Sequence, residues 1–393
     1  MTRATGAASD HVADVPFSLL TTGRVLGRVG ARFGIAPRLR PVRHQGLRIA
    51  LSLAVTWIAP MVLASVQPER PSALSFTADF EPHVRALVAI PLLLFADVQI
   101  DPTVRRIVRS LASRRRCRAP DELRARARSL QHLVRHPISE LVIVALAFLF
   151  VPAWIRNHTS GRETWIFRTG SGGPELTAAG TWTAWVIAPL YMFLLLRWLW
   201  RWIVLALVFA TSAPLLRPVV SHGDRCGGFS FVSRAPARFA WVIAGASTLV
   251  SARMLFAIVH DRIPARGVEH QALAIVGLAL VLAFFPLFAF APNFAHAKRL
   301  GLRRHRTVLE GHARNIERKW FGRAYPADVS SEESSSLADA SSVYDRVSSM
   351  RIIPYLPGHL LAVSMAALLP MLPLLSKVAS IDAIVRRVFA ALL

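Results

Sequence analysis

Residues 182–216 read WTAWVIAPLYMFLLLRWLWRWIVLALVFATSAPLL, an apolar run whose only charged residues are Arg197 and Arg201. A transmembrane helix needs about 20 mostly apolar residues, and this run is longer than that. It is rich in Leu and Ala and shows no alternation of period two, so it predicts a helix and not a strand. We therefore expect a membrane-crossing helix that begins near Trp182.

Six further apolar runs lie on either side of this one. Together they predict seven spans, at about 47–66, 86–100, 138–155, 182–202, 239–259, 272–292 and 352–375, of which the second is short and ends at Asp97 and Asp101. The predicted fold class is all-α: a helical integral membrane protein of about seven transmembrane helices with cytoplasmic helical extensions. A transmembrane domain at 47–375 would follow a basic N-terminal arm at 1–46 and precede an amphipathic tail at 376–393, for which an eighth span is the alternative.

The composition agrees with a membrane location. The chain has 393 residues, of which 53% are hydrophobic and 18% charged, and its formal net charge is +24. This apolar content excludes a disordered basic tail, and two cysteines are too few for a disulfide scaffold. A membrane protein remains, with a soluble nucleic-acid binder as the alternative.

The distribution of basic residues predicts the orientation. Of the 47 Lys and Arg residues, 34 fall in four alternate segments: 1–48, 101–137, 213–238 and 293–351. Cytoplasmic loops carry the Lys and Arg excess, so these segments and the N-terminus are expected in the cytoplasm. Arginine far outnumbers lysine, as in proteins of GC-rich bacteria, and the predicted location is the bacterial inner (plasma) membrane.

The sixth span is expected to continue as a helix from Asn293 to Trp320. After Pro326 the chain becomes rich in Ser and acidic residues up to Ser342, which is typical of a mobile loop.

Arg197 and Arg201 allow two interpretations. They lie four residues apart and share a helix face, so they could line a path deep in the membrane. Alternatively, their interleaving with Trp198, Trp200 and Trp202 indicates the headgroup belt, with the guanidinium groups reaching outward to lipid or another anion. We favour the belt, with the crossing ending near Arg201.

A basic cluster in the loop 101–137 is the other candidate lipid contact. Such clusters just inside a span bind anionic lipids, although charge that only sets the orientation explains them as well. No recognisable nucleic-acid-binding motif accompanies the run, so nucleic acid is not an expected partner. The residues are Arg114, Arg115, Arg116 and Arg118.

The loop 221–231 is the candidate functional loop. It contains His222, Asp224, Cys226, Gly227 and Gly228. Three metal-ligand types within five residues do not match a zinc signature, and the two glycines more simply permit a tight turn with positive φ.

This loop also carries a resemblance. The run His222 to Phe231, with AKRLGL at 297–302, LAD at 337–339 and MRIIP at 350–354, resembles a family of uncharacterised bacterial multi-pass membrane proteins. That family has a cytoplasmic loop of the type His-Pro-Asp-x-x-Gly-Gly-Leu-Gly-Phe, from which this chain departs at Gly223, Phe229 and Ser230. The resemblance implies the membrane location and architecture and no particular activity.

Two functions from different classes follow. Carboxylates are scarce within the spans, and no catalytic, cofactor-binding or metal-binding constellation is recognisable. We therefore expect a membrane-embedded scaffold or envelope-associated factor whose basic cytoplasmic face binds anionic lipid, with a homo-oligomer or a protein partner left open. The alternative is a transporter or channel-like protein with its inner mouth near 221–231, which prolines within the spans would suit.

Overall fold

The computed structural model describes residues 45–66, 74–159, 164–170, 173–259, 268–321 and 331–375. Within these ranges the protein is almost entirely helical, and seven helices are long and apolar enough to cross a membrane. They lie at Gln45–Ser65, Phe80–Leu111, Pro137–His158, Ala178–Leu215, Ser230–Val259, His270–Lys319 and Pro357–Leu374. The expected all-α fold with seven such helices is thereby confirmed. The arm up to residue 44 and the tail at 376–393 lie outside the described residues.

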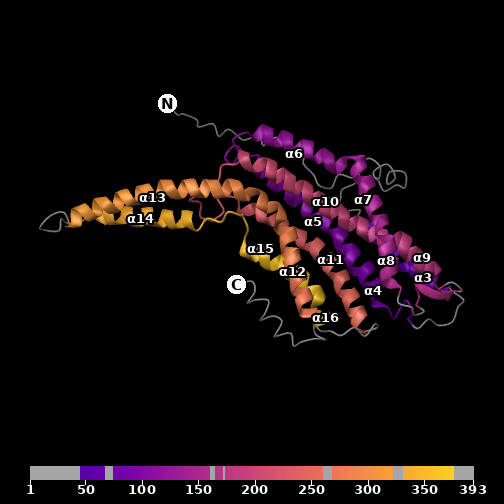
Figure 1. Cartoon of the computed structure of the whole chain (residues 1–393). Helices are drawn as coiled ribbons and strands as arrows, with labels where there is room; N and C mark the ends of the chain where they lie inside the picture. The colour runs from indigo at the N-terminus through magenta and orange to yellow at the C-terminus, as the bar shows by residue number, and fades with distance from the viewer. Residues whose placement is uncertain are drawn as a thin grey trace, which may run out of the picture.

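Long helices form the centre of the bundle, and Figure 1 shows them running along one another. They are α5 (Ile90–Leu111), α10 (Ala188–Ser212) and α11 (Arg234–Val259). Around them pack α2 (Gln45–Leu53), α6 (Pro120–Arg135), α7 (Pro137–Leu149), α8 (Val151–His158), α12 (Val268–Phe284) and α15 (Pro357–Leu368).

Shorter elements complete the helices or join them. One is a hairpin of β1 (Phe167–Gly170) and β2 (Gly173–Leu176), which pair antiparallel and which the apolar runs did not indicate. The others are α3 (Ala59–Ser65), α4 (Phe80–Val84), α9 (Ala178–Trp182), η4 (Ala213–Leu215), η5 (Ser230–Ser233) and α16 (Leu372–Leu375).

Prolines explain where the long helices depart from α geometry. The π-helical segments η1 (Ala54–Ile58), η2 (Arg85–Ala89) and η3 (Thr183–Ile187) each end two residues before a proline. Proline lacks an N–H and its ring crowds the carbonyl four residues earlier, so a wider turn relieves the clash. Two more prolines, Pro286 and Pro370, lie in the 3-10 segments η6 (Phe285–Phe290) and η7 (Leu369–Met371).

One of these sites shows how a carbonyl left free by proline is satisfied. In η1 the N–H of Ala59 donates to the carbonyl of Ala54, five residues earlier. With the same spacing of five residues, the carbonyl of Val55 would accept from the backbone N–H of residue 60. That residue is Pro60, which has no N–H. Nε1 of Trp182 donates to that carbonyl instead, at 3.0 Å. Because lipid offers no hydrogen bonds, this partner matters more here than it would in water.

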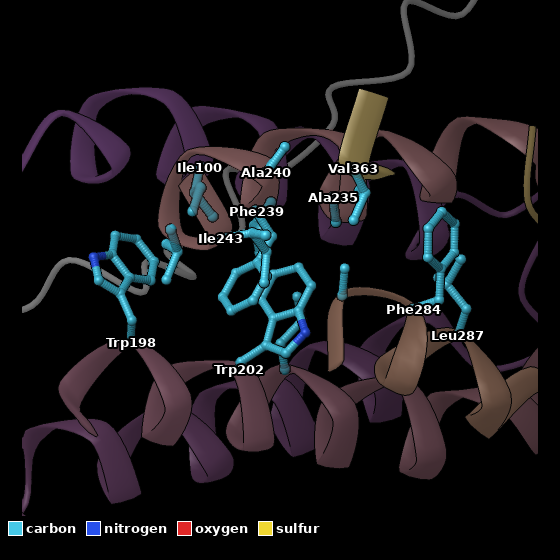
Figure 2. Close-up of a cluster of buried hydrophobic side chains, with 14 of the residues drawn as sticks. Ile100, Trp198, Trp202, Ala235, Phe239, Ala240, Ile243, Phe284, Leu287 and Val363 are labelled. Carbon is cyan, nitrogen blue, oxygen red and sulfur yellow. The ribbon is translucent and has the colours of Figure 1, made fainter. Parts of the chain in front are cut away.

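The core is built on buried tryptophans of α10 (Figure 2). Trp202 stacks on Phe239 of α11 with ring centroids 4.1 Å apart, and its Nε1 donates to the carbonyl of Leu282 at 2.9 Å. Nε1 of Trp198 donates to the carbonyl of Leu93 at 3.0 Å. Both indoles are therefore buried with their polar atom paired, which fixes α10 against α5, α11 and α12.

The second span is longer than the sequence predicted. Instead of residues 86–100, the helix runs without a break from Phe80 to Leu111 through α4, η2 and α5. Asp97 and Asp101, which were expected to end the span, are buried inside α5. They continue the helix because each pairs with an arginine, Asp97 with Arg201 at 2.8 Å and Asp101 with Arg105 at 2.6 Å.

The segment after the sixth span is a helical hairpin. As expected, the helix extends beyond the apolar run, here as α13 (Ala291–Phe321). The expectation of a mobile loop up to Ser342 is wrong from residue 331 onward, because α14 (Ser331–Ser348) folds back along α13. Figure 1 shows the pair projecting from the bundle. Half-buried residues recur every three or four positions in α14. One face of this polar helix therefore packs against α13.

Candidate functional site

The arginine-rich loop after α5 is held against the end of α10 by backbone hydrogen bonds. The N–H of Arg118 donates to the carbonyl of Leu215, and the N–H of Arg217 donates to that of Arg116, each at 2.8 Å. Cys117, which lies between Arg116 and Arg118, is buried where the two segments pair. We call this the basic end of the bundle: the end formed by the last turns of α5 and α10 and the first turns of α11 and α15.

A cleft of about 490 Å³ opens at the basic end between three helices. α5 contributes one face, at positions 103, 106, 107 and 110, which the helical period places together. α11 contributes residues four apart on its first turns, and α15 contributes a histidine. The lining residues are Thr103, Arg106, Ile107, Ser110, Arg116, Phe231, Arg234, Ala237, Arg238 and His359.

Local contacts orient the basic side chains of the cleft. Nη1 of Arg238 donates to Oε1 of Gln99 at 3.2 Å, and Nε of Arg106 donates to the carbonyl of Pro102 at 3.2 Å. The guanidinium of Arg116 lies over the ring of Phe231, 5.0 Å from its centroid. Each contact occupies only part of a guanidinium, which carries five N–H donors. The remaining donors can serve a ligand.

The electrostatics of the cleft favour an anion. Among the residues that the structure describes, no acidic side chain lines it, and none of its four arginines forms an ion pair. Nδ1 of His359 lies 2.6 Å from Oγ of Ser233, which fixes the imidazole at the rim. Planar guanidinium groups bind phosphate and carboxylate oxygens in a bidentate manner. The cleft is thus suited chemically to a phosphate-bearing anion.

The structure places the predicted lipid contacts in two groups. Arg116 lines the cleft, whereas Arg114, Arg115 and Arg118 are exposed beside it. The sequence indicated the arginine-rich loop. It could not indicate Arg234, Arg238 and His359, because their approach to the loop depends on how α11 and α15 pack against α5.

Contrary to the headgroup-belt interpretation, the guanidinium of Arg201 does not reach outward. Its side chain is only 2% exposed, and Nη1 pairs with Oδ1 of Asp97 at 2.8 Å. Asp97 accepts a second arginine, Arg48 of α2, at 3.0 Å. The sequence interpretation missed these pairs because Asp97 lies 104 residues from Arg201 along the chain and was taken to end its own span. Arg197 is half-buried on the same helix.

The loop 221–231 is a turn organised by one carboxylate. Asp224 accepts hydrogen bonds from the backbone N–H groups of Cys226, Gly228 and Ser230, at 2.9 to 3.1 Å. Its side chain also contacts His222, with Nδ1 2.8 Å from Oδ1. Burial alone would raise the pKa of the Asp224 carboxyl, but these donors outweigh burial and hold the pKa below its usual value.

The expected tight turn with positive φ is present. φ is 65° at Gly227 and 86° at Gly228, a conformation that glycine adopts without steric cost. The turn is attached to the segment before α15, because the N–H of Arg351 donates to the carbonyl of Arg225 at 2.7 Å. Cys226 is buried beneath it, and its Sγ lies 3.7 Å from the carbonyl of Tyr355. His222, Asp224 and Cys226 therefore do not converge on one point as metal ligands would.

A buried charged cluster lies at the opposite end of the bundle, near α4 and α8. Glu81 is 5% exposed and pairs with Arg85, with His158 at 3.3 Å and with Arg253 at 3.6 Å. Sequence reasoning missed it, although Glu81 and Arg85 have the four-residue spacing of a helical ion pair. Arg85, His158 and Arg253 all contact the carboxylate of Glu81, so the cluster joins the helices that carry these residues.

Asp79 lies beside this cluster and caps α4. Its carboxylate accepts from the N–H of Glu81 at 2.9 Å and from Nε1 of Trp165 at 3.0 Å. Burial raises the pKa of Asp79, an effect that the hydrogen bond from Trp165 only partly offsets.

Comparisons with family models, with curated proteins and with solved structures find no match to this chain. Within the described ranges, no group of three His, Cys, Asp or Glu side chains could hold a metal ion. The candidate site is thus defined by its geometry alone: it is an arginine-lined cleft at one end of a helical bundle.

Proposed function

We propose that the protein is a membrane-embedded scaffold of the bacterial inner membrane that binds the phosphate headgroups of anionic lipids in the arginine-lined cleft. The N-terminus and the basic end would face the cytoplasm. The observation that carries the proposal is the meeting of four arginines in one cleft, with no acidic side chain among the described residues that line it. The excess of Lys and Arg in the segments at this end supports the orientation.

The expected affinity follows from the charge. Each Lys or Arg near an anionic membrane surface contributes about 1 kcal/mol to binding. Geometry adds to this charge contribution. The guanidinium groups reach the cleft from α5, from the loop after α5 and from α11, so they can bind different oxygens of one phosphate. The apolar side chains of Ile107 and Phe231 line the same space and suit the glycerol portion of a lipid.

The test compares lipid binding by two double variants of equal charge. Arg234→Gln with Arg238→Gln removes two charges from the cleft, whereas Arg114→Gln with Arg115→Gln removes two exposed charges beside it. Dissociation constants for short-chain phosphatidylglycerol are measured on the purified full chain in detergent. We expect the cleft variant to lose about 2 kcal/mol, roughly 30-fold in affinity, because it removes direct charge-assisted hydrogen bonds to the headgroup. The control removes only exposed charges that solvent screens, so it should lose several-fold less.

Two further arms identify the ligand. Short-chain phosphatidylcholine should bind weakly, and glycerol phosphate in millimolar excess should compete poorly if the ligand is a lipid. Strong competition by glycerol phosphate would indicate a soluble phosphate compound instead. Equal loss in both double variants would contradict the proposal, because the cleft would then contribute no more than general surface charge.

One observation favours a transporter or channel-like protein as a second candidate. The buried pair of Asp97 and Arg201, joined by Arg48, places ionisable groups in the helix bundle, where they commonly mark transport paths. Solute or ion flux in proteoliposomes that Asp97→Asn abolishes would favour this class over the scaffold.

A further inference from the structure

A second, smaller cavity lies between α10 and the corner where α6 meets α7. Its volume is about 20 Å³, room for one water molecule or one ion of similar size. It is separate from the arginine-lined cleft and shares no lining residue with it. The lining residues are Val134, Ser139, Glu140, Ile143, Phe193, Arg197, Trp200 and Arg201.

Unpaired hydrogen-bond donors line this cavity. Nε and Nη2 of Arg201 and Nε1 of Trp200 are buried without a hydrogen-bond partner in the structure. Arg201 uses only Nη1, for Asp97. Leaving such groups unpaired costs about 1–3 kcal/mol for each, and more when the group is charged. Unpaired donors on residues that line one cavity are satisfied by an occupant that accepts hydrogen bonds.

The charge balance around the cavity decides between a neutral and an anionic occupant. Arg48, Arg197 and Arg201 carry three positive charges, and Asp97 and Glu140 carry two negative ones. Arg48 and Arg201 share the single carboxylate of Asp97. Arg197 forms no ion pair with any residue that the structure describes, and the buried Oε2 of Glu140 has no hydrogen-bond partner. One positive charge remains without a counter-charge in this cluster, in which Asp97 and Arg201 are buried and Arg197 and Glu140 are half-buried, so a small anion in the cavity would be stabilised.

We propose that this cavity is a binding site for one small inorganic anion, held by Arg197, Arg201 and the indole N–H of Trp200. Glu140 lies at its edge as a like charge that limits affinity. The site does not depend on the proposed lipid binding, because it uses different residues and a different cavity.

The test uses chloride as the probe, with gluconate at the same ionic strength as the reference. Thermal unfolding of the purified full chain is followed as chloride replaces gluconate. Binding to the folded state raises Tm as the concentration rises. We expect Tm to rise with the logarithm of the chloride or bromide concentration once it exceeds Kd, and to stay constant in gluconate. An identical Tm in all three salts would overturn the proposal, because the cavity would then hold only water.

Variants separate binding from folding. Trp200→Phe keeps an aromatic ring but removes the unpartnered indole N–H together with part of the ring system, so we expect a somewhat lower Tm in gluconate. The chloride affinity, taken from the rise in Tm relative to gluconate for the same variant, should fall several-fold. Trp185→Phe, at an exposed position, is the matched control and should change neither. Glu140→Gln removes the like charge and should tighten chloride binding by tenfold or more. Weaker chloride binding in Glu140→Gln would also overturn the proposal, as it would show that the carboxylate helps to hold the occupant.

Discussion

At the scale of single residues, the charged side chains of the buried clusters differ from those of the cleft. Those of the buried clusters, such as Glu81 and Asp97, are paired across helices and join segments far apart in the chain. Those of the cleft, such as Arg106 and Arg234, form no ion pair with a described residue and face open space. The first kind stabilises the bundle, and the second is available for a ligand.

Asp224 also stabilises the fold, but through local contacts with its own loop, and its contribution can be measured. Asp224→Asn keeps the shape but replaces one of the two acceptor oxygens by an NH2 group, so the N–H of Ser230 or those of Cys226 and Gly228 lose their acceptor, and the remaining oxygen is uncharged. We expect a loss of about 2 kcal/mol in the free energy of unfolding at pH 7, since hydrogen bonds to charged groups contribute about 1.5–3 kcal/mol. His222→Gln leaves the three backbone donors in place and should cost less than half as much. A loss in His222→Gln as large as that in Asp224→Asn would contradict this role.

The same residue predicts a pH dependence. The pKa of Asp224 is lower in the folded protein than the ordinary 3.8, so the unfolded chain binds its proton more tightly. The stabilisation is thus complete well above pH 3.8 and is lost as the pH falls through the folded pKa. The difference in Tm between the wild type and Asp224→Asn should shrink between pH 6 and pH 3.

At the scale of elements, prolines and tryptophans together shape the spans. Each of the segments η1, η2 and η3 ends before a proline, and η1 has a carbonyl that an indole on a neighbouring helix satisfies. Hydropathy indicates such helices but not their wide turns, because those depend on which carbonyl a proline leaves without a donor. The indole partner is on α9, more than 100 residues away, and no local pattern indicates it.

The pair of Trp182 and Pro60 can be tested by a double-mutant cycle. Trp182→Phe leaves the carbonyl of Val55 unpaired and should destabilise the protein by about 1–2 kcal/mol. Pro60→Ala supplies a backbone N–H to the same helix turn. In the Pro60→Ala background Trp182→Phe should therefore cost much less, a coupling measured from unfolding midpoints in detergent. Additive effects of the two substitutions would contradict the account of this turn.

At the scale of the whole molecule, the sequence predicted the number of spans correctly. It did not predict the contacts between the helices. Seven apolar runs are local features, and each of the seven expected spans overlaps one of the seven apolar helices of the structure, although the seventh helix begins at Pro357 and not at residue 352. The second is the instructive case, because Asp97 and Asp101 end an apolar run but not a helix when arginines pair with them. The cleft requires α5, α11 and α15 to meet, and that depends on packing of the whole bundle.

The proposed function requires that the basic end face the cytoplasm, and the bundle must cross the membrane for this to hold. Two exposed positions at opposite ends report on it: Arg115 in the loop after α5, and Arg168 in the hairpin near α8, whose side chain is 49% exposed. The native thiols of Cys117 and Cys226 interfere little, because both are buried and burial raises the pKa of each.

The decisive measurement is labelling of Arg115→Cys and Arg168→Cys with a thiol reagent that does not cross membranes. In right-side-out vesicles we predict rapid labelling of Arg168→Cys and protection of Arg115→Cys, which becomes reactive once detergent opens the vesicles. Inside-out vesicles should give the reverse. Labelling of Arg115→Cys in intact right-side-out vesicles would place the arginine-lined cleft on the outer face and contradict the proposed function.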